Sequence, residues 1–576
     1  MPGHNPEATK RFRGARDLLL ELRGDHKAAV SAFRWPRFEQ FNWALDWFDE
    51  VAVGNDRAAV RLIGADGSAR QLSYAELSAR SNQTANWLRR RGLRFGDRLL
   101  LMLDNEFAVW ETILAAIKLG VVVVPTYTSV SGHDLADRLV RGGVSHVLTE
   151  DRLTGRFAKF GAEITRLNTG REVSGWANYA ASDAESDVFT PGTETKATDP
   201  LFVYFTSGTT SLPKMVGHTH SSYPVGHLSG MFWNGLRPGD VHANVSAPGW
   251  AKHAWSSFFG PFNAEATVLS VSAVPGRPAA LLDTVRREQA TSLCAPPTAW
   301  RTLVQHDLGK RPASLREVTS VGEPLNPEVI EHLRRRWGLT VRDGYGQTEA
   351  TAMVGNTVGS VLKPGSMGRP LPGYDIRVID PETGRTAAEG EICVSLADEP
   401  TGLMTGYLGE EAKTAAVFAD GYYHTGDIAT VDADGYLTYV GRRDDVFKSF
   451  DHRISPFELE SALLEHPFVA EAAVVPVPDP VGMFVPKAFI AVAAGIRPTK
   501  EMARTILEAV GARLAPHQRI AALEFAELPK TTSGKIRRAE LREAERRAAT
   551  EPSAPGRLAW RAEELLGEFV RAAPGL

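Results

Sequence analysis

Residues 99 to 125 read LLLMLDNEFAVWETILAAIKLGVVVVP, and this stretch decides the fold class. The apolar run Leu99–Leu103 is typical of a buried strand, and the stretch Val109–Leu119 is typical of a helix. A second apolar run, Val121–Val124, is closed by Pro125 and predicts another strand. Strand, helix and strand in this order form a βαβ unit, whose two strands run parallel. The stretch therefore predicts an α/β fold with layered sheets and helices.

The same alternation of helices and strands extends on both sides of this unit. Ser73 and Glu76 have the spacing of a capping box, and they start a predicted helix that ends at Gly92. Further short apolar runs occur at residues 202–205, 268–271 and 318–321. Each is followed by glycine, proline or small polar residues, and ligands bind at such strand ends in open α/β sheets.

The character of the sequence changes after about Gly390. Strands there alternate with tight turns such as DADG at residues 432–435. A compact tail follows, with predicted helices at residues 456–466 and 500–514 and predicted strands near residues 469–477, 488–492 and 523. We place a domain boundary between Arg443 and Asp444. The prediction is a large N-terminal α/β domain, residues 1–443, and a small α+β C-terminal domain, residues 444–576.

The composition excludes several classes of protein. A net charge of −4 over 576 residues, with 43% hydrophobic and 23% charged residues, argues against disorder and against a nucleic-acid partner. The two cysteines, Cys294 and Cys393, have no metal-binding spacing. No apolar run approaches the roughly 18 residues that cross a bilayer, and the first residues lack the apolar segment of a signal peptide. We expect a cytoplasmic enzyme without a membrane partner.

The most distinctive loop reads TSGTTSLPK, from Thr206 to Lys214, and follows the predicted strand FVYF. Small hydroxyl residues around a glycine expose N–H and O–H donors, which suit phosphate oxygens. The loop is not a Walker A loop, because Pro213 precedes Lys214 and Met215 follows it. A flexible loop rich in Ser and Thr is the alternative that this stretch leaves open when it is taken alone.

Five further motifs follow in order along the chain. They are VGEP (321–324), DGYGQTE (343–349), YHTGD (423–427), GRRDDVFK (441–448) and TTSGKIR (531–537). With the loop at Thr206, this ordered set resembles the adenylate-forming superfamily of acyl-CoA synthetases, non-ribosomal peptide adenylation domains and luciferases. The resemblance covers residues 72–544. Three segments are most similar to the medium-chain acyl-CoA synthetase branch: YFTSGTTSLPKMV, RDGYGQTEAT and KSFDHRISPFELESALLEHP.

The resemblance implies an acid–thiol ligase that works in two half-reactions. A carboxylate first attacks the α-phosphate of ATP and magnesium pyrophosphate leaves; a thiol then attacks the acyl-adenylate and AMP leaves. The implied cofactors are ATP, Mg²⁺ and coenzyme A, and a homodimer is compatible with the sequence. An acyl carrier protein loaded in trans is the alternative acceptor. A catalytically dead nucleotide-binding protein is the alternative from another class, against which the presence of Lys535, Glu349 and Asp427 argues.

The resemblance also assigns roles to residues. Thr348 would bind the α-phosphate, and Glu349 would hold Mg²⁺, a cation that prefers carboxylate oxygen. Asp427 would accept both ribose hydroxyls, although an acidic residue near a turn is also commonly a cap. Tyr345 would stack on adenine, although it could equally be core. The implied nucleotide-binding set is Thr206, Ser207, Gly208, Thr209, Thr210, Lys214, Gly322, Glu323, Pro324, Asp343, Gly344, Tyr345, Gly346, Gln347, Asp427, Arg442 and Arg453.

Two residues of the predicted C-terminal domain have implied mechanical or chemical roles. Lys535 would bridge the acid's carboxylate and the α-phosphate, so that it offsets negative charge where that charge develops. With Thr348 and Glu349 it forms the implied catalytic set. Asp444 lies where the family has its hinge, and a hinge residue must tolerate two backbone conformations.

The acid pocket is implied to lie along Trp250, Lys252, His253 and Trp255, with Gly346 at its floor. Acetate-specific relatives have a tryptophan at the position of Gly346, so its absence predicts room for an acid larger than acetate: medium-chain, branched, aromatic or polycyclic. Lys252 and His253 are candidates to bind a polar substituent. A solvent-facing lysine and a packed histidine are the alternatives.

Overall fold

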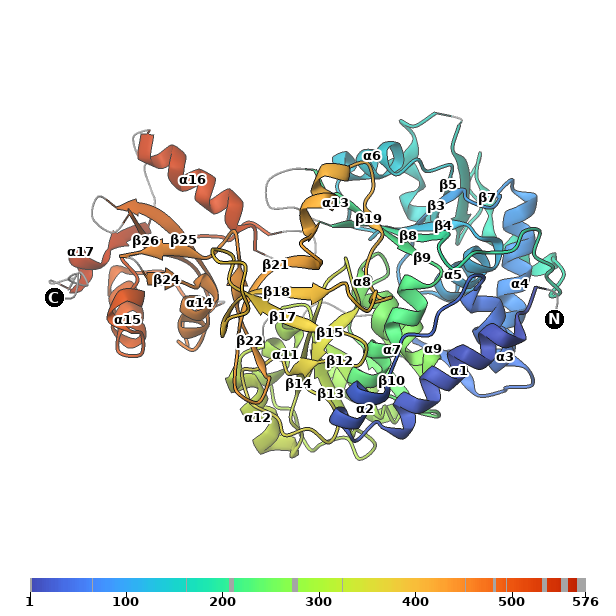
Figure 1. The fold of residues 1–576 in the computed structure, drawn as a ribbon. Helices are drawn as coiled ribbons and strands as arrows, with labels where there is room; N and C mark the ends of the chain where they lie inside the picture. Colours follow the sequence, from blue (N-terminus) through green and yellow to red (C-terminus); the bar gives the residue numbers. More distant parts are fainter. Residues whose placement is uncertain are drawn as a thin grey trace.

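The computed structural model describes residues 3–64, 66–161, 163–206, 212–271, 278–323, 325–450, 452–479, 483–493, 495–530, 536–550 and 558–566. Two large mixed sheets and a smaller antiparallel sheet form the main body. The C-terminal elements form a separate group, which lies on the left in Figure 1. The chain is therefore α/β, with a large N-terminal domain and a small C-terminal one.

The first large sheet has the strand order β16-β15-β14-β13-β12-β10-β11-β1-β2. Its strands are β1 (Ala58–Ile63), β2 (Ala69–Ser73), β10 (Val241–Asn244), β11 (Thr267–Val271), β12 (Ser292–Ala295), β13 (Glu317–Ser320), β14 (Arg342–Gly346), β15 (Ala352–Gly355) and β16 (Arg369–Pro370). Strands β1, β11, β10, β12, β13 and β14 pair in parallel, so their carboxyl ends share one edge. Residues 321–323 and 347–349 follow β13 and β14 at that edge, where ligands bind in such sheets.

The second large sheet contains the predicted βαβ unit. Its order is β19-β9-β8-β4-β3-β5-β6-β7. Its strands are β3 (Arg98–Met102), β4 (Val122–Pro125), β5 (His146–Glu150), β6 (Thr165–Thr169), β7 (Ala177–Asn178), β8 (Pro200–Thr206), β9 (Lys214–Thr219) and β19 (Gly406–Tyr407). Strands β3 and β4 pair in parallel, with Leu99 opposite Val123, and helix α5 (Phe107–Leu119) connects them in the sequence, which confirms the unit.

The smaller sheets follow in the C-terminal third of the chain. The antiparallel sheet of the main body contains β17 (Ile376–Ile379), β18 (Glu389–Ser395), β20 (Phe418–Ala419), β21 (Tyr422–Val431) and β22 (Leu437–Arg442). Beyond it lie the hairpin β23 (Phe447–Ser449) and β24 (His452–Ile454) and the sheet β25 (Val469–Asp479), β26 (Met483–Val492), β27 (Ala522–Phe525) and β28 (Leu558–Arg561). The predicted C-terminal helices and strands are all present; β28 is an addition that the sequence pattern did not predict.

Helices surround these sheets. They are α1 (Pro6–Glu21), α2 (His26–Ala32), α3 (Asp49–Ala52), α4 (Tyr74–Arg90), α5 (Phe107–Leu119), α6 (Gly132–Arg141), α7 (Ser222–Asn234), α8 (Ala251–Ala254), α9 (Gly260–Asn263), α10 (Pro278–Arg287), α11 (Pro297–Val304), α12 (Pro327–Trp337), α13 (Glu411–Val417), α14 (Pro456–Leu464), α15 (Lys500–Gly511), α16 (Arg538–Thr550) and α17 (Ala562–Leu566). The predicted capping box is present: the Ser73 hydroxyl accepts from the N–H of Glu76, and the Glu76 carboxylate accepts from the N–H of Ser73. Among the described residues, no helix is both long and apolar enough to cross a membrane.

Each part of the chain buries its own apolar residues. In the main body the largest cluster includes the fully buried indoles of Trp43, Trp47 and Trp110. A separate cluster joins α14, α15 and the C-terminal sheet through residues such as Leu459 and Ile490. A unit with its own hydrophobic core has the basis for folding as a domain, which supports the two-domain description.

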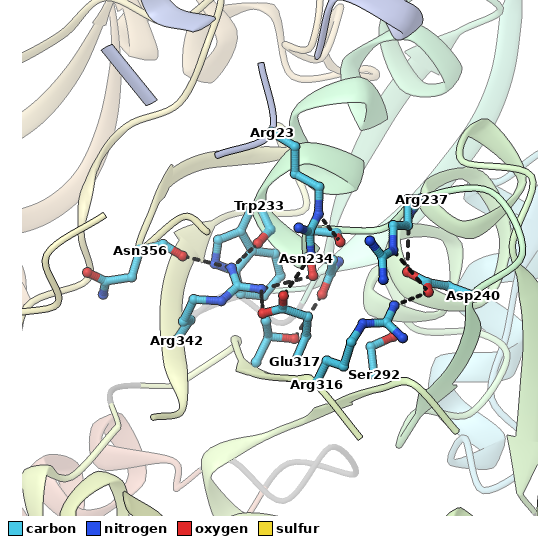
Figure 2. Close-up of polar contacts among 12 residues, drawn as sticks. Arg23, Trp233, Asn234, Arg237, Asp240, Ser292, Arg316, Glu317, Arg342 and Asn356 are labelled. Carbon is cyan, nitrogen blue, oxygen red and sulfur yellow. Dashed lines mark hydrogen bonds and ion pairs between the residues drawn. The ribbon is translucent and has the colours of Figure 1, made fainter. Parts of the chain in front are cut away.

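Strand β14, which carries the DGYG segment, is held by a buried arginine. The guanidinium of Arg342 donates to the backbone carbonyls of Trp233 and Asn234 at the end of α7, and to that of Asn356 at 3.0 Å. It also pairs with Glu317 at 3.0 Å, and Arg23 contacts the other oxygen of the same carboxylate at 2.6 Å (Figure 2). Cations stabilise helix C-termini by satisfying their unpaired carbonyls, so Arg342 ties the strand to the helix.

We expect the substitution Arg342→Met to lower the unfolding free energy by about 3 kcal/mol or more, because several buried acceptors and Glu317 lose their donor. The measurement is thermal denaturation of variant and wild type at equal concentration. Arg334→Met is the control: its exposed pair with Glu331 is worth about 0 to 1 kcal/mol. Equal melting temperatures for the two variants would contradict the anchoring role of Arg342.

Candidate active site

The predicted phosphate loop connects two antiparallel strands. Thr206 ends β8 and lies opposite Lys214, the first residue of β9. Ser207, Gly208, Thr209 and Thr210 lie outside the described residues. The ammonium of Lys214 lies 4.4 Å from the centre of the Tyr407 ring, a distance at which a cation is attracted to the ring face. The charge of Lys214 therefore lies beside Tyr407, the residue that also contacts Glu349.

Tyr407 connects Lys214 with the predicted metal ligand. Its hydroxyl donates to the Glu349 carboxylate at 3.1 Å, and the backbone carbonyl of Glu349 accepts from the N–H of Met404 at 2.8 Å. Burial, with the Glu349 charge next in importance, raises the pKa of Tyr407, so the phenol stays protonated and keeps donating. The Glu349 carboxylate suits Mg²⁺, which prefers carboxylate oxygen, and the Lys214 ammonium suits phosphate oxygens. The sequence analysis did not single out Tyr407.

Thr348 is positioned by a buried histidine that the sequence analysis also missed. Nε2 of His218 lies 2.7 Å from the backbone carbonyl of Thr348, and Nδ1 lies 3.2 Å from the Ser222 hydroxyl. Burial lowers the pKa of His218 to about 4, so the ring is neutral near pH 7. A carbonyl can only accept, so Nε2 carries the proton and Nδ1 accepts from Ser222. This ring fixes the backbone next to the predicted α-phosphate contact.

Asp427 is the centre of a buried polar cluster. Its carboxylate accepts from the hydroxyl of Tyr345 at 2.6 Å and from the amide of Gln347 at 2.5 Å. The other oxygen faces Arg442 at 3.2 Å and Tyr439 at 3.4 Å. Asp427 is 4% exposed. The structure thus brings four predicted nucleotide residues together, and a ribose would have to share or replace these donors.

The residues of the predicted adenine slot lie at the end of β13. Gly322 has φ of +110°, and a Cβ added there meets nothing within 4 Å, so the backbone itself borders open space. The Glu323 side chain pairs with Arg301 at 3.1 Å. Pro324 lies outside the described residues. An exposed glycine in the left-handed region allows a flat ligand to approach the backbone.

Asp343 forms hydrogen bonds with the backbone around the site. It is buried, and its carboxyl accepts from the N–H of Gly344 at 2.9 Å. Burial raises the pKa of Asp343 to about 8, against the lowering effect of backbone donors at Gly344 and Leu325. The side chain links β14 to the segment after β13, so its role in this structure is internal bonding.

Three of the predicted acid-binding side chains each contact a different part of the protein. Trp250 stacks on Tyr127, with ring centres 4.3 Å apart and planes 7° apart. Lys252 donates to the carbonyl of Val245 at 3.3 Å. His253 is buried beside Trp110, with ring centres 5.5 Å apart. His253 is thus the packed histidine of the alternative interpretation.

Gly346 lies against Trp255. A Cβ added to Gly346 would come within 2.5 Å of Cη2 of that indole and 2.3 Å of the carbonyl oxygen of Thr351. Real Cβ atoms do not make such contacts, so the backbone tolerates no side chain here unless something shifts. The place that a Cβ of residue 346 would take is therefore occupied by Trp255 and by the backbone of Thr351.

Three predicted residues of the C-terminal part remain. Arg453, on β24, contacts Glu382 of the main body at 3.2 Å. Asp444 lies beside Arg442, with Nε and Oδ1 3.5 Å apart, in the short connection from β22 to β23. Lys535 lies outside the described residues.

Asp427 on β21, Glu349 after β14 and Lys214 on β9 come from three sheets of the main body, which is the large domain of a two-domain α/β protein. The family models match it in both parts: "AMP-binding enzyme" over residues 48–408 and "AMP-binding enzyme C-terminal domain" over residues 458–535. The chain belongs to this AMP-binding family of adenylate-forming enzymes, as the sequence motifs predicted.

Individual relatives match over nearly the whole chain. A 4-hydroxybutyrate–CoA ligase of Metallosphaera sedula is 43% identical over 88% of this chain and 91% of the relative. The human mitochondrial acyl-coenzyme A synthetase ACSM3 is 37% identical over 88% of this chain and 90% of its own. The crystal structure of the anthranilate CoA ligase AuaEII with anthranoyl-AMP superposes with a TM-score of 0.80, at 26% identity, over 89% of this chain and 98% of the other.

We expect Asp343→Asn to change how stability depends on pH. A carboxyl whose pKa rises from 3.8 to about 8 on folding keeps a proton that the unfolded chain has released, so wild type loses stability as pH rises through that window. The asparagine lacks this loss, and its side-chain oxygen can still accept from Gly344. Between about pH 5 and pH 8 the variant should gain roughly 1 to 3 kcal/mol relative to wild type. Thermal melts across this range test it, and parallel curves would refute it.

Proposed function

We propose that this chain is an AMP-forming acyl-CoA synthetase. The observation that carries the proposal is that one short run holds three kinds of contact. Tyr345 and Gln347 bind Asp427, the Thr348 carbonyl is held by His218, and Glu349 meets Tyr407. A nucleotide lying along this run would meet its ribose, α-phosphate and metal contacts in sequence. The relatives, CoA ligases and acyl-CoA synthetases by name, support the same activity.

In the first half-reaction, a carboxylate oxygen attacks the α-phosphorus and the bond to pyrophosphate breaks. Asp427 and Arg442 would position the ribose, and Thr348 would bind the α-phosphate. Thr206, Lys214 and the loop between them would hold the outgoing phosphates. Asp427, Arg442 and the backbone of Thr348 have contacts within the protein, so they would act mainly by orientation and by charge.

Glu349 would hold Mg²⁺. Its carboxylate accepts a hydrogen bond from the Tyr407 hydroxyl, and its backbone carbonyl accepts one from Met404. Hard cations such as Mg²⁺ bind carboxylate oxygens and keep several waters. When bound, the ion neutralises charge on the pyrophosphate that leaves. Lys214 and Tyr407 would supply a cation and a hydroxyl beside it.

The two-domain arrangement would serve the change between half-reactions. We place the boundary at residues 443 and 444, because Asp444 lies in the connection between β22 and β23. With the C-terminal domain turned in, Lys535 would bridge the carboxylate and the α-phosphate. With it turned away, a thiol would reach the acyl carbon and displace AMP. The names of the relatives favour free CoA as that thiol over a carrier protein, and we propose the cytoplasm as the location.

The activity is tested by incubating the protein with ATP, Mg²⁺ and a panel of carboxylic acids, with and without CoA. Because the name of one relative specifies 4-hydroxybutyrate, the panel should include that acid with acetate, propionate, butyrate, octanoate and benzoate. We expect pyrophosphate release, and an acyl-CoA by mass spectrometry when CoA is present. If a holo carrier protein is acylated and CoA is not, CoA is not the acceptor. If no acid gives pyrophosphate release, the proposal is wrong.

Lys535→Ala should separate the half-reactions. A unit charge near 4 Å is worth about 4 kcal/mol gross at an effective dielectric near 20, which corresponds to roughly a thousandfold in rate. We expect acyl-adenylate formation to fall by about a hundredfold to a thousandfold, while thioester formation from supplied acyl-adenylate stays near wild type. Lys530→Ala is the matched control, because Lys530 pairs with Glu471 on the surface of the same domain. Equal loss in both half-reactions would count against the role of Lys535.

A further inference from the structure

Three side chains that can bind metal ions meet between β18 and β21, which pair antiparallel (Figure 1). Glu391 and Cys393 are two residues apart on β18, so their side chains lie on the same face of the sheet. Cys393 lies opposite His424 of β21. The carboxylate, the thiol and the imidazole therefore come together, with one ligand atom of each within 4.8 Å of the others. In the described part of the chain, no other group of His, Cys, Asp and Glu side chains does so.

The distances between these atoms suit a tetrahedral ion. Nδ1 of His424 lies 3.4 Å from Sγ of Cys393 and 3.2 Å from Oε2 of Glu391. Zinc binds sulfur at about 2.3 Å and nitrogen or oxygen at about 2.0 to 2.2 Å, so neighbouring ligands of a tetrahedral zinc ion lie roughly 3.3 to 3.6 Å apart. The imidazole is therefore already at the spacing from both neighbours that a shared ion requires.

A backbone contact orients the carboxylate of Glu391. The N–H of Gly426 donates to its Oε1 at 2.8 Å, while Oε2 faces His424. Gly426 has φ of +73° and lies where the register of the two strands shifts. Such bulges re-aim side chains and occur often beside functional sites. A hydrogen bond that fixes a ligating carboxylate is the usual support of a metal ligand.

A cation of the protein already contacts this group from the solvent side. Nη1 of Arg443 lies 3.2 Å from Oε2 of Glu391, the oxygen that also faces His424. The side chains of Arg443 and His424 are 61% and 22% exposed, whereas Cys393 is fully buried. An ion can therefore enter past His424 as the arginine turns outward. The guanidinium and the ion would compete for the same carboxylate oxygen.

We propose that Glu391, Cys393 and His424 form a zinc site, with water as the fourth ligand. Zinc accepts thiolate, imidazole and carboxylate together, while the harder Mg²⁺ takes oxygen ligands. The thiol loses its proton to water when the ion binds, as ligating thiols do. The site is separate from the Mg²⁺ proposed at Glu349, and it does not depend on the proposed function.

The position of this site gives the ion a mechanical consequence. It would connect β18 to His424, three residues before Asp427 on β21. It would also release Arg443, which directly precedes Asp444, the residue proposed as the hinge. The spacing of the cysteines in the sequence gives no sign of the site, because its contacts join residues 31 and 33 positions apart.

The experiment uses Co²⁺ as a spectroscopic substitute for zinc. Co²⁺ binds the same nitrogen, oxygen and sulfur sites, and a thiolate bound to it absorbs in the near ultraviolet by charge transfer. The full-length protein, reduced and freed of metal with a chelator, is titrated with cobalt chloride. We expect a charge-transfer band that saturates at one ion per chain. An equal amount of Zn²⁺ should remove the band, and a large excess of Mg²⁺ should not.

The chain's two cysteines provide a matched pair of variants. Cys393→Ser should abolish the band, and Cys294→Ser, which replaces the other fully buried thiol, should keep it. His424→Gln should weaken Co²⁺ binding by about tenfold or more, since even the loss of a residue that only supports a metal ligand has an effect of that size. Arg443→Ala should strengthen Co²⁺ binding by roughly twofold to fivefold, because it removes a competing, largely exposed ion pair.

Thermal melts show whether each variant is folded. The absence of a band in wild type, or its removal by Mg²⁺, would overturn the inference. An unchanged band in Cys393→Ser, or its loss in Cys294→Ser, would do the same. If Cys393→Ser does not fold, His424→Gln decides, and an unchanged Co²⁺ affinity there contradicts the site. Because the readout is metal binding, the outcome is independent of whether the protein activates an acid.

Discussion

The buried guanidinium of Arg342 is the interaction on which the site depends. It donates to the carbonyl end of α7 and pairs with the Glu317 carboxylate, which fastens β14 to the C-terminal end of that helix. Burying a cation is costly unless hydrogen bonds replace its water, and here carbonyls and a carboxylate do so. Since the next residues along the chain are the DGYGQTE run, the position of that run follows from this bond set.

Electrostatics in the site are arranged by burial as much as by charge. His218 is kept neutral, with a pKa lowered to about 4, so it can donate to Thr348 without adding a positive charge. The Asp427 carboxylate is buried among donors from Tyr345, Gln347 and Arg442. A ribose that binds Asp427 would share or replace these donors.

Gly346 shows what reasoning from one position leaves out. Compared with acetate-specific relatives, the missing tryptophan predicts room for an acid larger than acetate, and this stays a prediction. The structure adds that Trp255 lies against this glycine, with Cη2 2.5 Å from where a Cβ would be. Similarly, Lys252 and His253 are neighbours in sequence, yet one bonds a strand end and the other packs against Trp110.

By itself the sequence determined the βαβ unit, the capping box at Ser73, the family and the ordered motifs, because these depend on residue type and on short-range backbone preference. Only the tertiary structure decided which groups meet. Tyr345 and Asp427 are 82 residues apart, and His218 and Thr348 are 130 residues apart. Tyr407 entered the site in the same way, through its contact with Glu349. No local pattern encodes such contacts, since they arise when sheets and helices pack and each side chain takes the space that its neighbours leave.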